Sequence, residues 1–313
     1  MINSLIRTTL IVRNADAMKT FYEQVFGWSI SYESELELSG TILPCGRIGD
    51  RVKLYIMEGA DREIGKIGLL EWLEPRLPDT GGPDYKVGIG DIILVSDAPS
   101  IDDILEKVAT FPGAKIFSGA KDGTFPDPKG EGIIKYSSAR IFDPEGFFYE
   151  IYYRYNRPNP EKFTIRRTTC LVENVKRALN FYNETLEFDA YQDTTMQISD
   201  TIPGAKSGDL VRFVVCKSQH DYYGMIGALE FIDHPDSQKV MSKESLGTGK
   251  AVFVAHTSDA ENLYNIVKEK NLEISQELFS REVPRTGNQG KRKMKSMGFR
   301  DTEGFIWEVN QRG

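Results

Sequence analysis

Residues 6–28 are IRTTLIVRNADAMKTFYEQVFGW, and residues 166–188 are RRTTCLVENVKRALNFYNETLEF. In both stretches Arg-Thr-Thr opens an apolar segment, an Asn follows, and an amphipathic segment ends in Phe-Tyr before a further aromatic residue. Arg7 and Arg167 therefore correspond at an offset of 160 residues. The β-branched segment predicts a strand, and the helical spacing of apolar residues after it predicts a helix. We infer an internal duplication that opens each copy with this unit.

The duplication continues to the end of each copy. The strand-like segment IGLLEWLE at 67–74 corresponds to IGALEFID at 226–233. The closing segment SARIFDPEGFFYEI at 138–151 corresponds to MGFRDTEGFIWEV at 297–309. Residues 5–154 show the order β-α-β-β-β twice, with turns rich in Gly, Pro and Asp, and the second half repeats this order.

These correspondences divide the chain into two expected domains. The first domain comprises residues 1–155 and the second comprises residues 163–313, joined by the Pro-rich charged linker NRPNPEK at 156–162. A length of 313 residues is enough for about two domains of ordinary size. The sequence does not show which modules pair with one another in space.

The composition and net charge of the chain limit the classes of molecule that it is expected to bind. The chain is 40% apolar and 27% charged, which is typical of a globular protein, and its net charge of −7 argues against nucleic acid as a partner. The three cysteines are widely spaced, which favours a reducing, cytoplasmic location. No apolar run approaches the length of a membrane helix, so we expect no membrane partner. We expect a small-molecule ligand or substrate, and a monomer or a homodimer.

The repeated strand and helix, followed by Asp-Pro-Glu-Gly at 143–146 and Asp-Thr-Glu-Gly at 301–304, resemble the vicinal oxygen chelate superfamily. This group contains glyoxalases, bleomycin-resistance proteins and extradiol dioxygenases. The resemblance covers nearly the whole chain, twice. It implies an α+β fold of tandem glyoxalase-like domains, each with two βαβββ modules whose curved mixed sheets form a ligand-binding cup.

The resemblance also implies where a metal would bind, because metal-dependent members take ligands from the first, fourth, fifth and eighth strands. The corresponding positions here are Arg7 and Arg167, Glu71 and Glu230, Gly90 and Gly249, and Glu150 and Glu308. Arginine has no free lone pair and carries its own positive charge, so it cannot ligate a divalent cation. The three histidines, His220, His234 and His256, correspond to none of these positions. We therefore expect no metal and no other cofactor, with a divalent metal as the alternative if the alignment is shifted.

Each arginine is instead expected to pair with a carboxylate of its own half, because a guanidinium fork matches a carboxylate at two points. The expected partners are Glu150 or Glu71 for Arg7, and Glu308 or Glu230 for Arg167. An arginine that stays partly free would anchor an anionic or carbonyl group of a ligand. Glu150 and Glu308 are also the candidate catalytic residues, although a neighbouring arginine opposes the protonation that a general base needs.

Strand alternation extends the candidate ligand-binding set beyond these charged residues. It adds Thr9, Thr169, Phe148, Tyr152 and Asn310 to Arg7, Arg167, Glu71, Glu230, Glu150 and Glu308. By the same alternation Trp72 and Phe231 are expected to point away from the cup. The loops at 39–50, 199–209, 120–132 and 282–293 are candidate lids. The basic run Lys291, Arg292, Lys293 and Lys295 is expected to be part of a solvated loop, with capture of an anion as the alternative.

The favoured interpretation is a metal-free member of the superfamily that binds a small hydrophobic or aromatic molecule in a β-sheet cup. The content of 17 Phe and 14 Tyr agrees with such a ligand. The alternative is an enzyme of the glyoxalase or lyase, isomerase or extradiol-dioxygenase type that acts on a small carbonyl or aromatic substrate. A structural or interaction module is a third hypothesis, since a fold does not by itself define a chemistry.

Overall fold

The computed structural model describes residues 2–38, 49–60, 63–77, 85, 87–127, 130, 132–198, 202–217, 223–232, 248–284 and 291–313. The first half forms β1 (Ile2–Ile11), α1 (Ala15–Phe26), β2 (Ser29–Glu37), β3 (Arg51–Glu58), β4 (Lys66–Glu74), β5 (Ile92–Asp97), α2 (Ile101–Thr110), β6 (Lys115–Pro126), β7 (Ile133–Phe142) and β8 (Phe148–Arg154). The second half forms β9 (Thr164–Leu171), α3 (Val175–Glu184), β10 (Asp189–Gln197), β11 (Leu210–Lys217), β12 (Met225–Phe231), β13 (Ala251–Thr257), α4 (Ala260–Glu269), β14 (Ile274–Pro284), β15 (Lys291–Arg300) and β16 (Ile306–Arg312).

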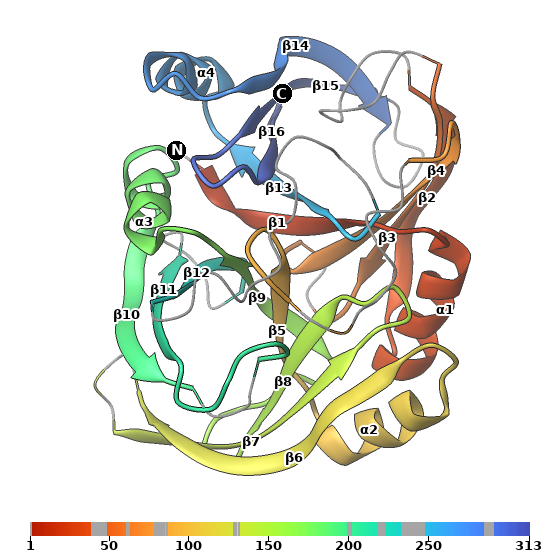
Figure 1. The fold of residues 1–313 in the computed structure, drawn as a ribbon. Helices are drawn as coiled ribbons and strands as arrows, with labels where there is room; N and C mark the ends of the chain where they lie inside the picture. The colour runs from red at the N-terminus through yellow and green to blue at the C-terminus, as the bar shows by residue number, and fades with distance from the viewer. Residues whose placement is uncertain are drawn as a thin grey trace.

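The strands form two curved eight-stranded sheets, which lie one above the other in Figure 1. Sheet I has the order β14-β15-β16-β13-β1-β4-β3-β2, and sheet II has the order β10-β11-β12-β9-β5-β8-β7-β6. Each sheet mixes parallel and antiparallel pairs, and each bends into half of a barrel. This confirms the expected α+β fold of tandem glyoxalase-like units built from βαβββ modules.

Each sheet takes one module from each half of the sequence. Antiparallel pairing of β1 with β13 joins the first and fourth modules in sheet I, and antiparallel pairing of β5 with β9 joins the second and third in sheet II. The linker at 156–162 connects β8 to β9 within sheet II. The modules therefore pair across the two halves of the sequence, a choice that the sequence left open. Each cup contains one module from the first half and one from the second.

The Asn that follows the first strand of each copy begins the helix. The side chain of Asn14 accepts a hydrogen bond from the backbone N–H of Ala17 at 2.9 Å, and Asn174 does the same for Arg177 at 2.8 Å. Gly27 ends α1 in the left-handed conformation. The aromatic pair near the end of each helix is buried in the main core, which explains why Phe-Tyr recurs in the duplication.

The Asp-Pro-Glu-Gly turn between β7 and β8 is organised by its first residue. Asp143 accepts hydrogen bonds from the backbone N–H groups of Glu145 (3.0 Å) and Phe147 (2.9 Å) and from the hydroxyl of Tyr149 (3.0 Å). The Tyr149 hydroxyl lies 2.5 Å from that of Tyr22 on α1. Burial raises the pKa of Asp143 to about 7 despite these donors.

The Glu of the same turn ties the two sheets together within each half. Glu145 accepts hydrogen bonds from the backbone N–H groups of Arg13 (3.1 Å) and Asn14 (3.2 Å), where β1 leads into α1. In the second half, Glu303 accepts from the backbone N–H of Glu173 (3.0 Å). The turn and the strand–helix junction belong to the same half of the sequence but to different sheets. This contact therefore connects the two modules of one half, whereas strand pairing within each sheet connects modules of different halves.

A pseudo-twofold axis passes between the sheets. The hydroxyls of the equivalent residues Thr8 and Thr168 lie 2.8 Å apart and are buried. Around them, a Cβ added to Gly65 would lie 2.5 Å from the carbonyl oxygen of Ile165. A Cβ added to the equivalent Gly224 would lie 2.6 Å from that of Leu5. Reciprocal contacts of this kind are those of an isologous dimer interface, here formed within one chain.

Some element boundaries differ from the sequence prediction. The segment 120–132 is not wholly a loop, because β6 continues to Pro126 in antiparallel pairing with β7. The basic residues from Lys291 to Lys295 belong to β15 instead of a solvated loop. Of the candidate lids, residues 39–48, 285–290 and 199–201 lie outside the described residues. Within the described residues, no helix has the length and apolar character needed to span a membrane.

We expect Gly65→Ala to destabilise the protein more than Gly27→Ala. Both glycines have a left-handed φ, of 70° and 69°, but a Cβ at Gly27 meets nothing within 4 Å. Gly27→Ala should therefore lower the free energy of unfolding by about 1 kcal/mol, the strain of that conformation. Gly65→Ala adds a clash with backbone at the pseudo-twofold axis and should lower it by about 3 kcal/mol or more. Urea unfolding of both variants measures the difference, and equal losses would contradict the close approach.

Candidate functional site

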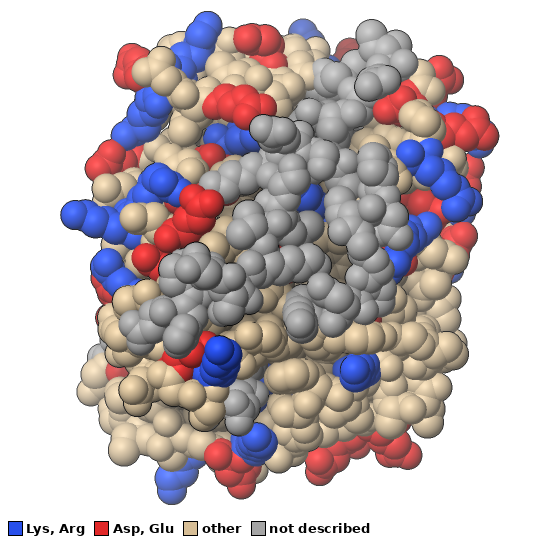
Figure 2. Space-filling model, in the orientation of Figure 1, with Lys and Arg blue, Asp and Glu red and all other residues tan. Residues whose placement is uncertain are grey.

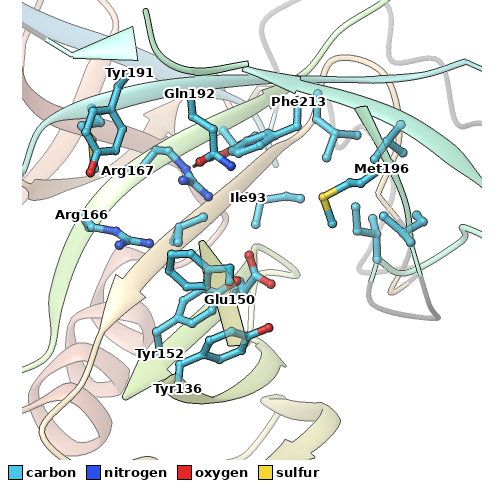
Figure 3. A pocket seen from close by; sticks show the side chains of 18 of the residues that line it. Ile93, Tyr136, Glu150, Tyr152, Arg166, Arg167, Tyr191, Gln192, Met196 and Phe213 are labelled. Carbon is cyan, nitrogen blue, oxygen red and sulfur yellow. Dashed lines mark hydrogen bonds between the residues drawn. The ribbon is translucent and has the colours of Figure 1, made fainter. Parts of the chain in front are cut away.

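Sheet II encloses a cavity of about 210 Å³ (Figure 3). Each of its eight strands contributes at least one side chain to the lining. One from each strand, in chain order, is Ile93, Phe125, Tyr136, Phe148, Arg167, Met196, Phe213 and Leu229. Figure 2 shows that the part of the visible face over this sheet is mostly uncharged except along its lower rim, whereas charged groups of both signs are frequent farther up. The cavity is thus a largely apolar space between modules of different halves.

Two β-bulges increase the polar part of the lining. Arg167 pairs with Val95 and Ile165 pairs with Ser96, so Arg166 is an extra residue in β9. The extra residue breaks the strand alternation, and both neighbouring arginines line the cavity. The same happens in β10, where a register shift between Ala190 and Gln192 brings Tyr191 and Gln192 to the cavity together.

Arg167 is held on two sides. Its Nε donates a hydrogen bond to Thr169 Oγ1 at 3.0 Å, and its guanidinium lies 4.7 Å from the centre of the Phe213 ring. Gly227 provides the space, because a Cβ there would lie 2.8 Å from Thr169 Oγ1. Among the described residues no carboxylate lies within ion-pair distance of Arg167. Burial lowers the pKa of Arg167 to about 10, so the guanidinium still carries its charge at neutral pH.

Glu150, which is equivalent to the Glu308 that contacts Arg7 in sheet I, is paired with another arginine, Arg140. Its Oε1 accepts a hydrogen bond from Arg140 Nη2 at 2.8 Å, directly across from β7 to β8. Arg140 is buried, and Glu150 lines the cavity below Arg167 in Figure 3. The cavity therefore contains one neutralised carboxylate and a guanidinium with no acidic partner among the described residues.

The equivalent site in sheet I is arranged differently. Arg7 Nη2 lies 3.8 Å from Glu308, and Arg281 lies 3.3 Å from the same carboxylate. Asn310 also donates to Glu308, at 3.0 Å. The expectation that Arg7 pairs with a carboxylate of its own half is wrong, because the module on the β13 side of β1 comes from the other half and brings Glu308 on β16. Arg167, for the same reason, does not pair with Glu308.

An exchange of arginine and glycine explains the difference between the sheets. Arg140 lies opposite Glu150, whereas the residue opposite Glu308 is Gly298. Conversely, Arg281 pairs with Met294 in sheet I at the position where sheet II has Gly123 paired with Tyr136. A Cβ on Gly123 would lie 2.5 Å from the Tyr136 hydroxyl. The glycine in sheet II thus admits a cavity-lining tyrosine.

The two fourth-strand carboxylates have another role. Glu71 accepts a hydrogen bond from the first backbone N–H of α1 at 2.9 Å, and Glu230 does the same for α3 at 2.8 Å. Acceptors at a helix N-terminus are stabilising. The expectation that Glu71 and Glu230 point into the cup is wrong, because the alignment is shifted by one residue and this places them on the opposite face of the strand. Trp72 and Phe231, expected to point away, instead pack with the residues of the concave faces.

Other predicted residues lie where alternation places them. Thr169, Phe148 and Tyr152 line the cavity with Arg167 and Glu150. In sheet I, Thr9 accepts from Arg7 Nε at 3.0 Å, and Asn310 contacts Glu308. Sequence reasoning missed the contributions of Arg166, Tyr191, Gln192, Met196 and Tyr136. The adjacent arginines at 166–167 were visible, but the bulge that turns both inward was not.

A divalent metal does not fit the donors that the described residues offer. Within the described part of the chain, no group of three or more His, Cys, Asp or Glu side chains is arranged to hold a metal ion. His256, the one histidine with described coordinates, lies on β13, where burial and nearby arginines lower its pKa to about 4. In the cavity a cation would meet Arg167 and Arg166 beside a carboxylate already bound to Arg140.

Comparison with known proteins agrees with this architecture. Residues 164–309 match the model of the Glyoxalase/Bleomycin resistance protein/Dioxygenase superfamily. A point mutant of glyoxalase I from Zea mays is 15% identical, with a TM-score of 0.62 over 98% of this chain and 93% of that one. A candidate dioxygenase from Bacillus subtilis is 14% identical, with a TM-score of 0.56 over 99% of this chain and 85% of that one. At these identities the likeness shows the fold alone. A search of curated proteins found no match to the sequence.

The two equivalent arginines should respond oppositely to replacement by methionine. Arg167→Met removes a desolvated charge that no described carboxylate neutralises, so we expect it to raise the free energy of unfolding by about 1 kcal/mol. Arg7→Met takes a cation from the buried Glu308, so we expect a loss of about 1–3 kcal/mol. Urea unfolding in the absence of ligand measures both. A destabilising Arg167→Met together with a neutral Arg7→Met would contradict this assignment of the charges.

Proposed function

Because the second half of the chain belongs to the Glyoxalase/Bleomycin resistance protein/Dioxygenase superfamily, and the whole chain has the fold of two fused glyoxalase-like domains, we propose that sheet II binds a small hydrophobic or aromatic molecule without a metal ion. The observation that carries this proposal is the cavity, which has an apolar and aromatic wall and a few polar groups. Sites with this composition are typical of small-molecule binding.

The size of the cavity supports a ligand with one or two rings. A dry cavity of roughly 150 Å³ in another protein takes up benzene, so about 210 Å³ leaves room for a ring with a substituent. Side chains of Ile93, Phe148 and Leu229 provide apolar surface from the centre of the sheet. Burial of a ligand ring against them contributes roughly 25 cal/mol for each Å² of apolar area removed from water.

The charges favour sheet II over the equivalent site in sheet I. In sheet I the arginine of the first strand lies beside Glu308, which Arg281 and Asn310 also contact. In sheet II Arg140 satisfies Glu150, and Arg167 faces the cavity (Figure 3). In sheet II a polar group of a ligand can therefore accept a hydrogen bond from Arg167 without first breaking an ion pair between that arginine and a described carboxylate.

Catalysis is the second candidate function, and Glu150 is the observation that favours it. The carboxylate lines the cavity, and a carboxylate in this position can accept a proton from a bound substrate. Tyr136 and Tyr152 lie on the same side of the cavity. In this alternative the protein is a lyase or isomerase of a small carbonyl or aromatic compound, and Glu150→Gln removes turnover while leaving binding intact.

Filling the cavity should abolish binding of a neutral aromatic probe. We expect indole to raise the melting temperature of the wild type, by an amount equivalent to roughly 2.7 kcal/mol when its concentration is 100 times Kd. Met196→Trp places a larger ring in the lining from the partly exposed strand β10 and should remove this shift. The control is Leu36→Trp at the equivalent position of β2 in sheet I, which should keep it. A shift lost in Leu36→Trp and kept in Met196→Trp would place the binding site in the other sheet.

Removal of metal should not affect binding. We expect protein purified without a chelator to hold no stoichiometric transition metal by mass spectrometry, because the described donors do not form a divalent site. Dialysis against EDTA should leave the affinity for indole unchanged. A stoichiometric metal that is lost in Glu150→Gln would refute the metal-free proposal.

A further inference from the structure

We propose that the ligand of sheet II is an aromatic carboxylate whose carboxylate group binds Arg167. This inference rests on the proposed function and specifies the chemical class of the ligand. It begins from a feature that binding of a neutral molecule does not require, namely a guanidinium with no acidic partner among the described residues inside an apolar cavity.

The contacts of Arg167 leave one edge of the guanidinium available. Thr169 occupies the Nε side at 3.0 Å, and the ring of Phe213 lies 4.7 Å from the guanidinium carbon. Among the described residues neither Nη group of Arg167 has a hydrogen bond or an ion pair. Two parallel N–H donors on one edge match the two oxygens of a carboxylate. Thr169 and Phe213 hold this edge in place before the ligand arrives, which reduces the entropic cost of binding.

The protein carboxylate that could occupy this edge is kept away from it. Glu150 sits on β8, which pairs with β5 in the same sheet, and its equivalent in sheet I does approach the first-strand arginine. Arg140 holds Glu150 at 2.8 Å from the neighbouring strand. The second nearby acid, Asp97, is paired with the buried Arg154 at 2.9 Å. Neither carboxylate is therefore committed to Arg167.

A single negative charge on the ligand would neutralise Arg167. Glu150 in the lining is already paired with Arg140, so Arg167 is left without an acidic partner among the described residues. A monoanion supplies that partner, whereas a cationic ligand would be repelled by Arg167. The remaining wall is apolar, with Ile93, Phe148 and Leu229 placed to cover a ring. A planar ring that carries one carboxylate satisfies both parts of the site.

The first measurement compares an acid with its neutral isostere. We expect phenylacetate to bind wild-type protein at least about tenfold more tightly than phenylacetamide in isothermal titration calorimetry, the effect of a hydrogen-bonded charge pair. Arg167→Met should bind both probes with the same affinity. Arg167→Lys keeps the charge but lacks the fork, and should keep only part of the preference. Arg7→Met, the matched change in sheet I, should keep it fully.

A second set of variants tests why Arg167 is available. Arg140→Met should release Glu150 to pair with Arg167, so the preference for phenylacetate should fall at least about tenfold while phenylacetamide binding is kept. Adding Glu150→Gln to Arg140→Met removes the competing charge and should restore the preference. A structural role of Arg140 alone would not predict this rescue. Circular dichroism of each variant checks that the fold is retained.

The outcomes separate this inference from the proposed function. Equal binding of acid and amide to the wild type, with both lost in Met196→Trp, would overturn the carboxylate inference and keep the proposed function. Binding of neither probe and no response to indole would overturn both. A preference for phenylacetate that survives Arg167→Met and disappears in Arg7→Met would move the anion site to sheet I and so overturn the inference.

Discussion

The ion pair between Arg140 and Glu150 holds this carboxylate on the β7–β8 strand pair, away from pairing with Arg167. A carboxylate on the last strand of a module lies close to the arginine on the first strand of the module beside it, and sheet I shows the two in contact. In sheet II a second arginine, directly across the strand pair, takes the carboxylate instead. Arg167 is then left facing an apolar space, where burial makes its charge costly unless a ligand neutralises it.

This arrangement shows how two equivalent sheets of a duplicated fold can differ in charge through few changes. The two sheets share strand order, helix caps, the Asp-centred turn and the Arg–Thr hydrogen bond of the first strand. They differ by a reciprocal exchange of arginine and glycine on the neighbouring strands. Because every strand of a curved sheet contributes alternate residues to the same concave face, one exchange changes both the charge balance and the space in the cup.

Much of the fold followed from patterns in the sequence. The Asn caps, the Phe-Tyr core positions and the turn at 143–146 recur at fixed offsets because each module needs the same local hydrogen bonds and the same apolar face. Alternation along β8 and β9 correctly placed Phe148, Tyr152 and Thr169 beside Glu150 and Arg167. It failed in the fourth strand, where Glu71 and Glu230 serve the helix ends, because an alignment cannot resolve a shift of one residue that reverses the face.

By itself the sequence determined the duplication, the module order and the presence of arginine at both first-strand positions. Only the tertiary structure decided which modules share a sheet, and hence that Arg7 meets Glu308 while Arg140 takes Glu150. The reason is that equivalent modules present the same backbone edge and the same apolar face, so pairing within a half or across halves satisfies the same local pattern. The choice depends on contacts between residues far apart in the chain, such as Thr8 with Thr168 at the pseudo-twofold axis.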